Sequence, residues 1–255
     1  MSYIQAENRG HILVITLNRP EARNAFNAEM AAEMESVIDR YEADPELRVA
    51  VLRAEGSTFC AGQDLKEAAQ GKLALTAKRG AFGVMRKPPV KPLIAAVEGQ
   101  ALAGGMELTL CCDLVVASSA SVFGLAEVRR SLVAIGGGLF RLPKRVPWPV
   151  AMEMILTAEP KSAQEMKHFG FVNSVVEPGA VLEEALRFAA LIARNGPLAV
   201  KASKGIALAA MMENWRDDEA WDRQMVIAAP VQHSEDLKEG LAAFAQKREP
   251  VWKAR

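Results

Sequence analysis

The chain has 255 residues, of which 50% are hydrophobic and 24% charged, a composition typical of a globular protein that can bury a large core. Thirty-one basic residues balance 31 acidic ones, which argues against nucleic acid or an anionic membrane as the main partner. The three cysteines form no CxxC pair and suit a reducing compartment. There is no signal-peptide pattern and no apolar run long enough to cross a bilayer, so we expect a cytoplasmic protein.

The first 65 residues alternate between buried strands and a helix. Residues 11–17 and 49–52 are short apolar runs that predict strands buried on both faces. Between them, Asn27 is placed to cap a helix that Asp44-Pro45 would end. Strand, helix and strand in this order predict a right-handed crossover and parallel pairing. Residues 55–65 then predict a strand-like entry into a glycine turn.

The middle of the chain carries the most informative stretch. Residues 66–87 are polar and alanine-rich, and we interpret them as an irregular helix and a mobile segment. Residues 94–108 predict a buried strand, a turn of small residues and a helix that opens at Gly104-Gly105. The start of that helix would present unpaired N–H groups, with Glu107 one turn further on among apolar neighbours.

The second half changes from strands to helices alone. Residues 114–117 and 172–176 predict strands, and Ser162 with Glu165 forms a capping-box pattern for a helix that ends at Gly170. From Ala180 onward only helical segments follow, with breaks at Gly196-Pro197 and around Pro230. We therefore predict an α/β core over residues 1–197 and a helical region over 198–255, which would cover the core or another subunit.

Several kinds of site have no support in the sequence. The three histidines are scattered and lack ligand-spaced partners, so we expect no metal site; His168, near a helix end, is more typical of a packing residue. No GxSxG, GxxxxGK[ST] or GxGxxG motif is present, which disfavours an α/β-hydrolase and the phosphate-binding nucleotide enzymes.

Two glycine turns and two acids remain as candidates. The turns at Gly62-Gln63 and Gly104-Gly105 could each direct a backbone N–H group at one oxygen, as in an oxyanion hole. Glu107 and Glu127 both lie in apolar surroundings, where burial would raise a carboxyl pKa and suit it to proton transfer. Purely structural interpretations stay open. Glycine turns are common at strand ends, the Glu107 carboxylate could interact favourably with the helix dipole, and Glu127 could form an ion pair with Arg129 or Arg130.

Five separate motifs, in order, resemble the enoyl-CoA hydratase/isomerase (crotonase) superfamily over nearly the whole chain. They are the stretch from Leu17 to Pro20 with Arg23-Asn24-Ala25, residues 59–66, residues 99–113, Phe123-Gly124 with Glu127, and residues 170–173. The resemblance implies an α/β fold with a crotonase-like ββα spiral core and a C-terminal helical oligomerisation region.

The resemblance also implies roles for individual residues. The backbone N–H groups of Gln63 and Gly104 would form an oxyanion hole around a thioester carbonyl, and Glu107 and Glu127 would be the two catalytic acids of a hydratase. The remaining residues would bind the coenzyme A part of the substrate: Ala61, Asp64 and Leu65 through the main chain, and Arg23, Lys66, Phe244 and Lys247 through side chains. For Lys247 a solvated helix end is an equal alternative. No permanently bound cofactor is implied, because coenzyme A belongs to the substrate.

The implied reaction is reversible syn addition of water across the 2,3 double bond of an enoyl-CoA. Gln63 stands where many hydratases have alanine, and residues 133–138 lack a proline that many members carry. Residues 139–143 are similar to the branch that includes carnitinyl-CoA (crotonobetainyl-CoA) hydratases, so the acyl group stays open. The C-terminal helices would build a homo-trimer, or a hexamer formed by two trimers. Isomerisation on the same scaffold and a weakly catalytic CoA-binding or interaction protein are the alternatives.

Overall fold

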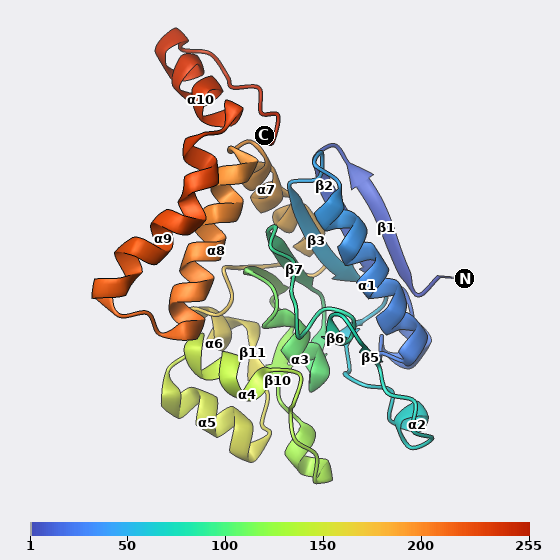
Figure 1. The fold of residues 1–255 in the computed structure, drawn as a ribbon. Coiled ribbons are helices and arrows are strands. Elements are labelled where there is room, and N and C mark those ends of the chain that lie inside the picture. The colour runs from blue at the N-terminus through green and yellow to red at the C-terminus, as the bar shows by residue number, and fades with distance from the viewer. Residues whose placement is uncertain (1) are drawn as a thin grey trace.

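A six-stranded sheet forms the centre of the structure, a computed structural model that describes residues 2–255 (Figure 1). The strand order is β1-β2-β3-β7-β9-β12, with β1 antiparallel to β2 and every other pair parallel. The parallel pairing of residues 11–17 with 49–52 is confirmed, whereas the hairpin partner β1 was not predicted. The strands are β1 (Ile4–Arg9), β2 (Ile12–Leu17), β3 (Val49–Ala54), β7 (Leu93–Val97), β9 (Leu114–Ser118) and β12 (Ser174–Val176).

A smaller sheet of four short strands lies beside the first. Its order is β11-β10-β8-β4, and β8 is parallel to both β4 and β10. The chain passes from β7 into β8 through Gly99, whose φ of +72° is a conformation that glycine adopts without strain. The strands are β4 (Thr58–Cys60), β8 (Gln100–Leu102), β10 (Val122–Gly124) and β11 (Lys161–Ser162). The predicted turn of small residues before Gly104 is thus partly a strand.

Alternate residues of the central strands enter two different cores, as expected for strands buried on both faces. Val49 and Val51 of β3 pack with the apolar side of α7 (Val181–Ala193), while Ala50 and Leu52 belong to the larger core. That larger core includes α1 (Ala28–Ala43), whose N-cap Asn27 accepts a hydrogen bond from the Met30 N–H at 2.9 Å. The predicted boundaries of α1 are therefore confirmed.

Shorter helices lie between the strands, and two of them, α3 (Gly104–Thr109) and α6 (Ala163–His168), lead from the small sheet to the large one. The capping box at Ser162 and Glu165 is present and begins α6. The others are α2 (Leu65–Ala68), α4 (Gly138–Arg141), α5 (Trp148–Thr157), and the 3-10 turns η1 (Pro20–Ala22), η2 (Glu127–Arg130) and η3 (Leu142–Lys144).

The segment between α2 and β7 differs from its prediction. The irregular helix is limited to the four residues of α2, and a two-stranded hairpin of β5 (Leu75–Thr76) and β6 (Gly80–Ala81) follows. Arg79 is only 1% exposed and donates to Asp39 at 2.7 Å and to Glu42 at 2.5 Å, both on α1. A buried ion-pair network thus attaches this segment to α1; its mobility stays a prediction.

Three C-terminal helices follow the core: α8 and α9 lie next to each other along one side, and α10 lies beyond them at one end of the molecule (Figure 1). They are α8 (Pro197–Glu213), α9 (Asp217–Gln232) and α10 (Glu235–Gln246). α8 begins at Pro197 as predicted, but Pro230 lies inside α9, and the unpredicted break after α8 is at Asn214, where φ is +51°. Lys204 ties α8 to the core through Asp113 at 2.7 Å. The division into regions 1–197 and 198–255 stays a prediction.

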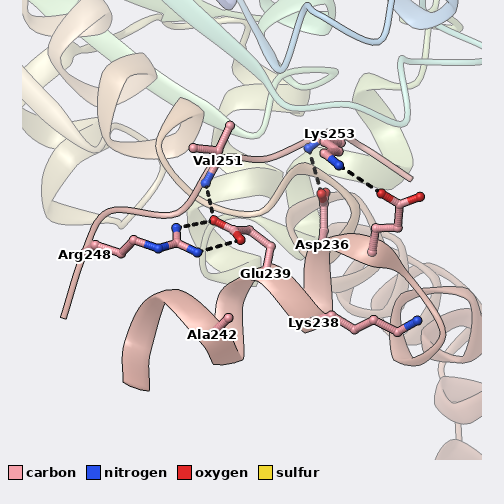
Figure 2. Close-up of a pocket in the computed structure, with 8 residues that line it drawn as sticks. Asp236, Lys238, Glu239, Ala242, Arg248, Val251 and Lys253 are labelled. Atoms are coloured by element: carbon pink, nitrogen blue, oxygen red, sulfur yellow. Dashed lines mark hydrogen bonds and ion pairs between the residues drawn. The ribbon is translucent and has the colours of Figure 1, made fainter. Parts of the chain in front are cut away.

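The last residues of the chain fold back along α10, and a hollow separates the two (Figure 2). Its acidic side chains are already engaged: Glu239 pairs with Arg248 and accepts the Val251 N–H at 2.8 Å, and Asp236 accepts the Lys253 N–H at 2.8 Å. Trp252 adds a further contact that holds the C-terminal residues in place, because its Nε1–H donates to the Arg194 carbonyl at 2.8 Å. We therefore assign this hollow to tail anchoring rather than to ligand binding.

No helix within residues 2–255 is both long and apolar enough to cross a membrane.

Candidate active site

Two glycine turns from different strands touch each other in the small sheet. A Cβ atom on Gly62 would lie 3.1 Å from the Gly104 nitrogen, and one on Gly104 would lie 3.3 Å from the Gly62 Cα atom. Side chains at these positions would separate the two turns, which explains the glycines. The structure therefore brings the two predicted turns together.

The N–H groups of Gln63 and Gly104 are both free for an external acceptor. Phe26 forms a parallel bridge to Gln63 by donating to the Gly62 carbonyl and accepting from the Asp64 N–H, each at 2.8 Å. In that pattern the N–H of Gln63 points away from Phe26. Gly104 is the first residue of α3, so its N–H has no intrahelical acceptor. Within residues 2–255 neither N–H donates to a backbone carbonyl.

Ala103, directly before the helix, has an unusual backbone conformation. Its φ of +52° and ψ of −125° lie outside the regions that residues with a Cβ atom normally occupy. Its N–H donates to the Gly124 carbonyl at 2.8 Å, so β10 holds the strained residue in place. Such strain is concentrated at functional sites because the surrounding structure must support it. The sequence offered no signal for it.

α3 carries Glu107 on an element that is buried at all six residues. A Cβ atom on Gly105 would lie 2.0 Å from the carbonyl oxygen of Cys60, so α3 packs against β4 too closely for a side chain at this position. Glu107 itself is only 5% exposed. Its carboxylate accepts the Gly138 N–H at 2.9 Å, so its direction is set by a contact outside its own helix.

The glycine run at 136–138 surrounds that carboxylate. A Cβ atom on Gly136 would lie 2.6 Å from Glu107 Oε2, and one on Gly138 would lie 3.1 Å from Oε1. Burial raises the pKa of Glu107, while the N–H groups of the glycine run and the charge of Arg141 act in the opposite direction. No local sequence pattern indicates that this run encloses the acid.

Glu127 begins η2 and supplies the second acid. Burial, and secondarily the charge of Glu107, raise its pKa to about 7, although its own backbone N–H acts to lower it. Its Oε2 atom is buried and has no hydrogen-bond partner among residues 2–255. Glu127 does not form the alternative ion pair with Arg129, because Arg129 instead pairs with Glu159 at 2.7 Å. Glu127 is therefore available for proton transfer near neutral pH.

Five residues expected to bind coenzyme A, Ala61, Asp64 and Leu65 through the main chain and Arg23 and Lys66 at its phosphates, lie close to Gln63 in the fold. Arg23 and Lys66 are exposed, and Leu65 is half exposed. The Ala61 N–H already donates to the Arg23 carbonyl at 3.1 Å, and the Asp64 N–H to Phe26. The Asp64 carboxylate pairs with Arg19 at 2.8 Å and caps α2. The carbonyls of Asp64 and Leu65 accept the Ala68 and Ala69 N–H groups at 2.9 and 3.1 Å, so much of this main chain is already hydrogen-bonded within the protein.

Phe244 and Lys247 are not part of this arrangement within one chain. Both lie at the end of α10, which is far from α3 in Figure 1. Phe244 is 86% exposed, so it is free to contact another molecule.

No group of three or more potential metal ligands occurs within residues 2–255. His168 packs edge-on against Phe169, with 5.4 Å between ring centroids.

The profile of the enoyl-CoA hydratase/isomerase family matches residues 7–255, and the chain belongs to this family. Enoyl-CoA hydratase EchA19 of Mycobacterium tuberculosis is 40% identical over 98% of this chain and 96% of its own length. Carnitinyl-CoA dehydratase of Proteus mirabilis is 41% identical over 97% of both proteins. The structure superposes on the crystal structure of enoyl-CoA hydratase EchA1 from Mycobacterium marinum over 100% of both chains, with a TM-score of 0.96 and 47% sequence identity. The predicted fold class and superfamily are thereby confirmed.

Proposed function

We propose that this protein is an enoyl-CoA hydratase, a hydro-lyase that adds water syn across the 2,3 double bond of an enoyl-CoA thioester. The observation that carries the proposal is that two acids shielded from solvent accompany two free backbone N–H groups: Glu107 lies on the helix that Gly104 begins, and Glu127 follows the strand that is bonded to Ala103. Hydration requires an acid, a base and stabilisation of a developing oxyanion, and this arrangement can supply all three.

In the proposed mechanism, the thioester oxygen accepts hydrogen bonds from the Gln63 and Gly104 N–H groups. Glu107 in its ionised form, which the glycine N–H groups favour, takes a proton from the attacking water. The water oxygen bonds to the β-carbon while negative charge moves onto the thioester oxygen. Glu127 in its protonated form then delivers a proton to the α-carbon. The N–H groups favour the transition state because the oxygen carries more charge there than in the substrate.

The acyl group is the open part of the proposal. Relatives named carnitinyl-CoA dehydratase and mevalonyl-coenzyme A hydratase, at 41% and 39% identity, suggest acyl groups with polar substituents. One feature supports a polar acyl group here: the Gln63 Nε2 atom is buried without a partner among residues 2–255. A hydroxyl or carboxylate oxygen on the substrate could accept its hydrogen bond. Crotonobetainyl-CoA has a trimethylammonium group and no such oxygen, so it is the second candidate substrate on the strength of the carnitinyl-CoA dehydratase relatives alone.

Two other activities remain as alternatives. Double-bond isomerisation would use the same oxyanion hole but needs only one acid to move a proton, so the presence of two coupled acids favours hydration. A CoA-binding or interaction protein with little catalysis would not need a carboxyl group with a pKa of about 7 in its site.

The test is the loss of the conjugated-thioester absorbance on mixing the protein with crotonyl-CoA, crotonobetainyl-CoA and longer enoyl-CoAs. Hydration of at least one member, with the 3-hydroxy product identified by mass, supports the proposal. Absence of any absorbance change over the whole panel would overturn it. Formation of an isomer of unchanged mass would favour the isomerase.

We further propose a homo-trimer, alone or paired into a hexamer. Supporting this are large apolar side chains exposed on the C-terminal helices, including Trp221, Val226, Leu241 and Phe244. In such an assembly Phe244 and Lys247 could reach coenzyme A bound to a neighbouring subunit. Sedimentation velocity with and without coenzyme A tests both statements, and a monomer at micromolar concentration would refute the first.

No permanently bound cofactor is needed for this chemistry. We also propose a cytoplasmic location and a role in fatty acid or related lipid metabolism. The three free, buried cysteines support a reducing compartment.

A further inference from the structure

Arg141 forms a bridge between three separate parts of the candidate site. From the end of α4, its Nη1–H groups donate to the Gly136 carbonyl at 3.2 Å and contact Cys111 Sγ of the α3 region at 3.6 Å. Its Nη2–H donates to the Met85 carbonyl at 2.7 Å. One guanidinium group therefore joins the glycine run, the catalytic-helix region and the segment before β7.

The glycine run has the shape that this guanidinium requires. Gly137 has φ of +112°, and a Cβ atom there would overlap Arg141 Nη1. A Cβ atom on Gly136 would strike both Met85 Sδ, at 2.5 Å, and the Glu107 carboxylate. The backbone of the run is thus enclosed between Arg141 on one side and Glu107 on the other.

The two sides of the run are connected through its peptide groups. Arg141 holds the Gly136 carbonyl, and two residues later the Gly138 N–H donates to Glu107 Oε1. The Gly136 carbonyl and the Gly138 N–H belong to adjacent planar peptide groups joined at Gly137 Cα, so holding one peptide group restricts the orientation of the next. Losing the guanidinium would free the Gly136 carbonyl and allow the N–H groups to turn away from the carboxylate.

From this geometry we infer that Arg141 is a positioning residue for the proposed hydratase reaction. It keeps the glycine run folded around Glu107, so that the carboxylate is directed at the water and stays available as a base. It acts through the peptide groups and contacts no substrate itself. The role of Glu107 as the base rests on the proposed function, whereas the contacts of Arg141 with the glycine run do not depend on it.

Few charged or titratable groups face Glu107. Arg141 approaches from α4 and Glu127 from η2, while the Cys111 thiol follows on the same stretch of chain. The charge of Arg141 opposes the rise that burial causes in the pKa of Glu107. Removing the guanidinium should therefore raise that pKa further.

The experiment compares Arg141→Met and Arg141→Lys with a matched control, Arg145→Met. Arg145 is a neighbouring arginine that donates to the Cys112 carbonyl at 3.2 Å and lies over the Phe171 ring, but has no contact with the glycine run. In Arg141→Met we expect kcat for enoyl-CoA hydration to fall about 10²-fold with little change in KM. In the same variant, the acid limb of the pH profile of the hydration rate should move to higher pH by about one pH unit. Arg141→Lys should lower kcat yet keep the limb close to the wild-type position, because the charge remains.

A second readout does not depend on activity. In protein labelled with ¹³C-glutamate, the carboxyl resonance that Glu107→Gln abolishes belongs to Glu107 and can be titrated directly. Its midpoint should rise in Arg141→Met and stay unchanged in Arg145→Met. An unchanged midpoint in Arg141→Met, or an equal rise in the control, overturns the inference. If the wild-type protein hydrates no enoyl-CoA, the proposed function fails, and this titration alone decides the role of Arg141.

Discussion

Glu107 and Glu127 are 20 positions apart in sequence, yet the charge of Glu107 contributes to raising the pKa of Glu127. Glu107 is enclosed by backbone N–H groups, whereas an oxygen of Glu127 is buried with no partner. These surroundings push the two acids toward different protonation states, which is how one site can hold an acid and a base at the same pH.

Replacing either acid by glutamine should nearly abolish hydration. Because each group transfers a proton in the reaction, we expect kcat to fall by about 10²–10⁴-fold in Glu107→Gln and in Glu127→Gln. Initial rates with the best enoyl-CoA measure this. Glu159→Gln is the control, since Glu159 is an exposed acid that pairs with Arg129, and it should retain its rate. Full activity in either site variant would contradict the mechanism.

The pH dependence of kcat/KM should be a bell whose basic limb lies near pH 7, the pKa of Glu127. The working enzyme holds one proton on the pair, so rates fall at low pH when Glu107 is protonated and at high pH when Glu127 is ionised. The same singly protonated pair serves dehydration. Profiles measured in both directions should therefore coincide, and a basic limb seen in only one direction would be inconsistent with proton transfer by these two groups.

Glu127→Gln should stabilise the folded protein above pH 7. The pKa of Glu127 is raised from 4.5 to about 7 in the folded state, so the folded state binds more protons than the unfolded chain between these values. Stability is therefore lost as pH rises through this range, and the penalty is complete above pH 7. We expect a gain on the order of 1–2 kcal/mol at pH 8, reduced by partial solvent exposure, and almost none at pH 4.5. Urea unfolding at fixed protein concentration tests this; an equal gain at both pH values would point to another cause.

Gly62→Ala should damage the oxyanion hole. A methyl group would lie 3.1 Å from the Gly104 nitrogen, and φ of +103° disfavours alanine. We expect kcat to fall by about 10²–10³-fold, the effect of losing one donor. Gly71→Ala is the matched control, because Gly71 also has positive φ, +80°, but nothing lies within 4 Å of its Cβ position. Equal losses in both variants would assign the effect to backbone strain alone.

Arg79→Met should destabilise the protein by about 3–5 kcal/mol, because Asp39 and Glu42 would lose their buried partner. Lys78→Met removes an exposed partner of the same Asp39 and should cost less than about 1 kcal/mol. Denaturant unfolding measures both. Similar costs for the two variants would show that the buried position of Arg79 adds nothing.

Local sequence patterns predicted the elements that depend on periodicity and capping. The cap at Asn27, the capping box at Ser162 and the parallel pairing of β2 with β3 follow from rules that act over a few residues. Short elements in the small sheet were missed because β8 has only three residues, too few for an alternating pattern to be distinct from a turn.

The candidate site was only partly accessible to such reasoning. The oxyanion turns and both acids were named from motifs, since each motif is contiguous in sequence. The cradle of Gly136 and Gly138 and the contacts of Arg141 arise from long-range packing, and no local pattern indicates which carboxylate a glycine run will enclose. The strain at Ala103 could not be foreseen either, because alanine gives no sign of positive φ.

The unequal burial of the two acids has a consequence for how such a scaffold can diversify. Glu107 belongs to a helix with every residue in the core, so exchanging it would disturb packing around it. Glu127 starts a 3-10 turn whose residues are all at least partly exposed, although its own Oε2 atom is shielded from solvent, and it can be replaced at little cost to the fold. New reactions on this framework are thus expected to arise by keeping the first acid and sampling substitutions at the second.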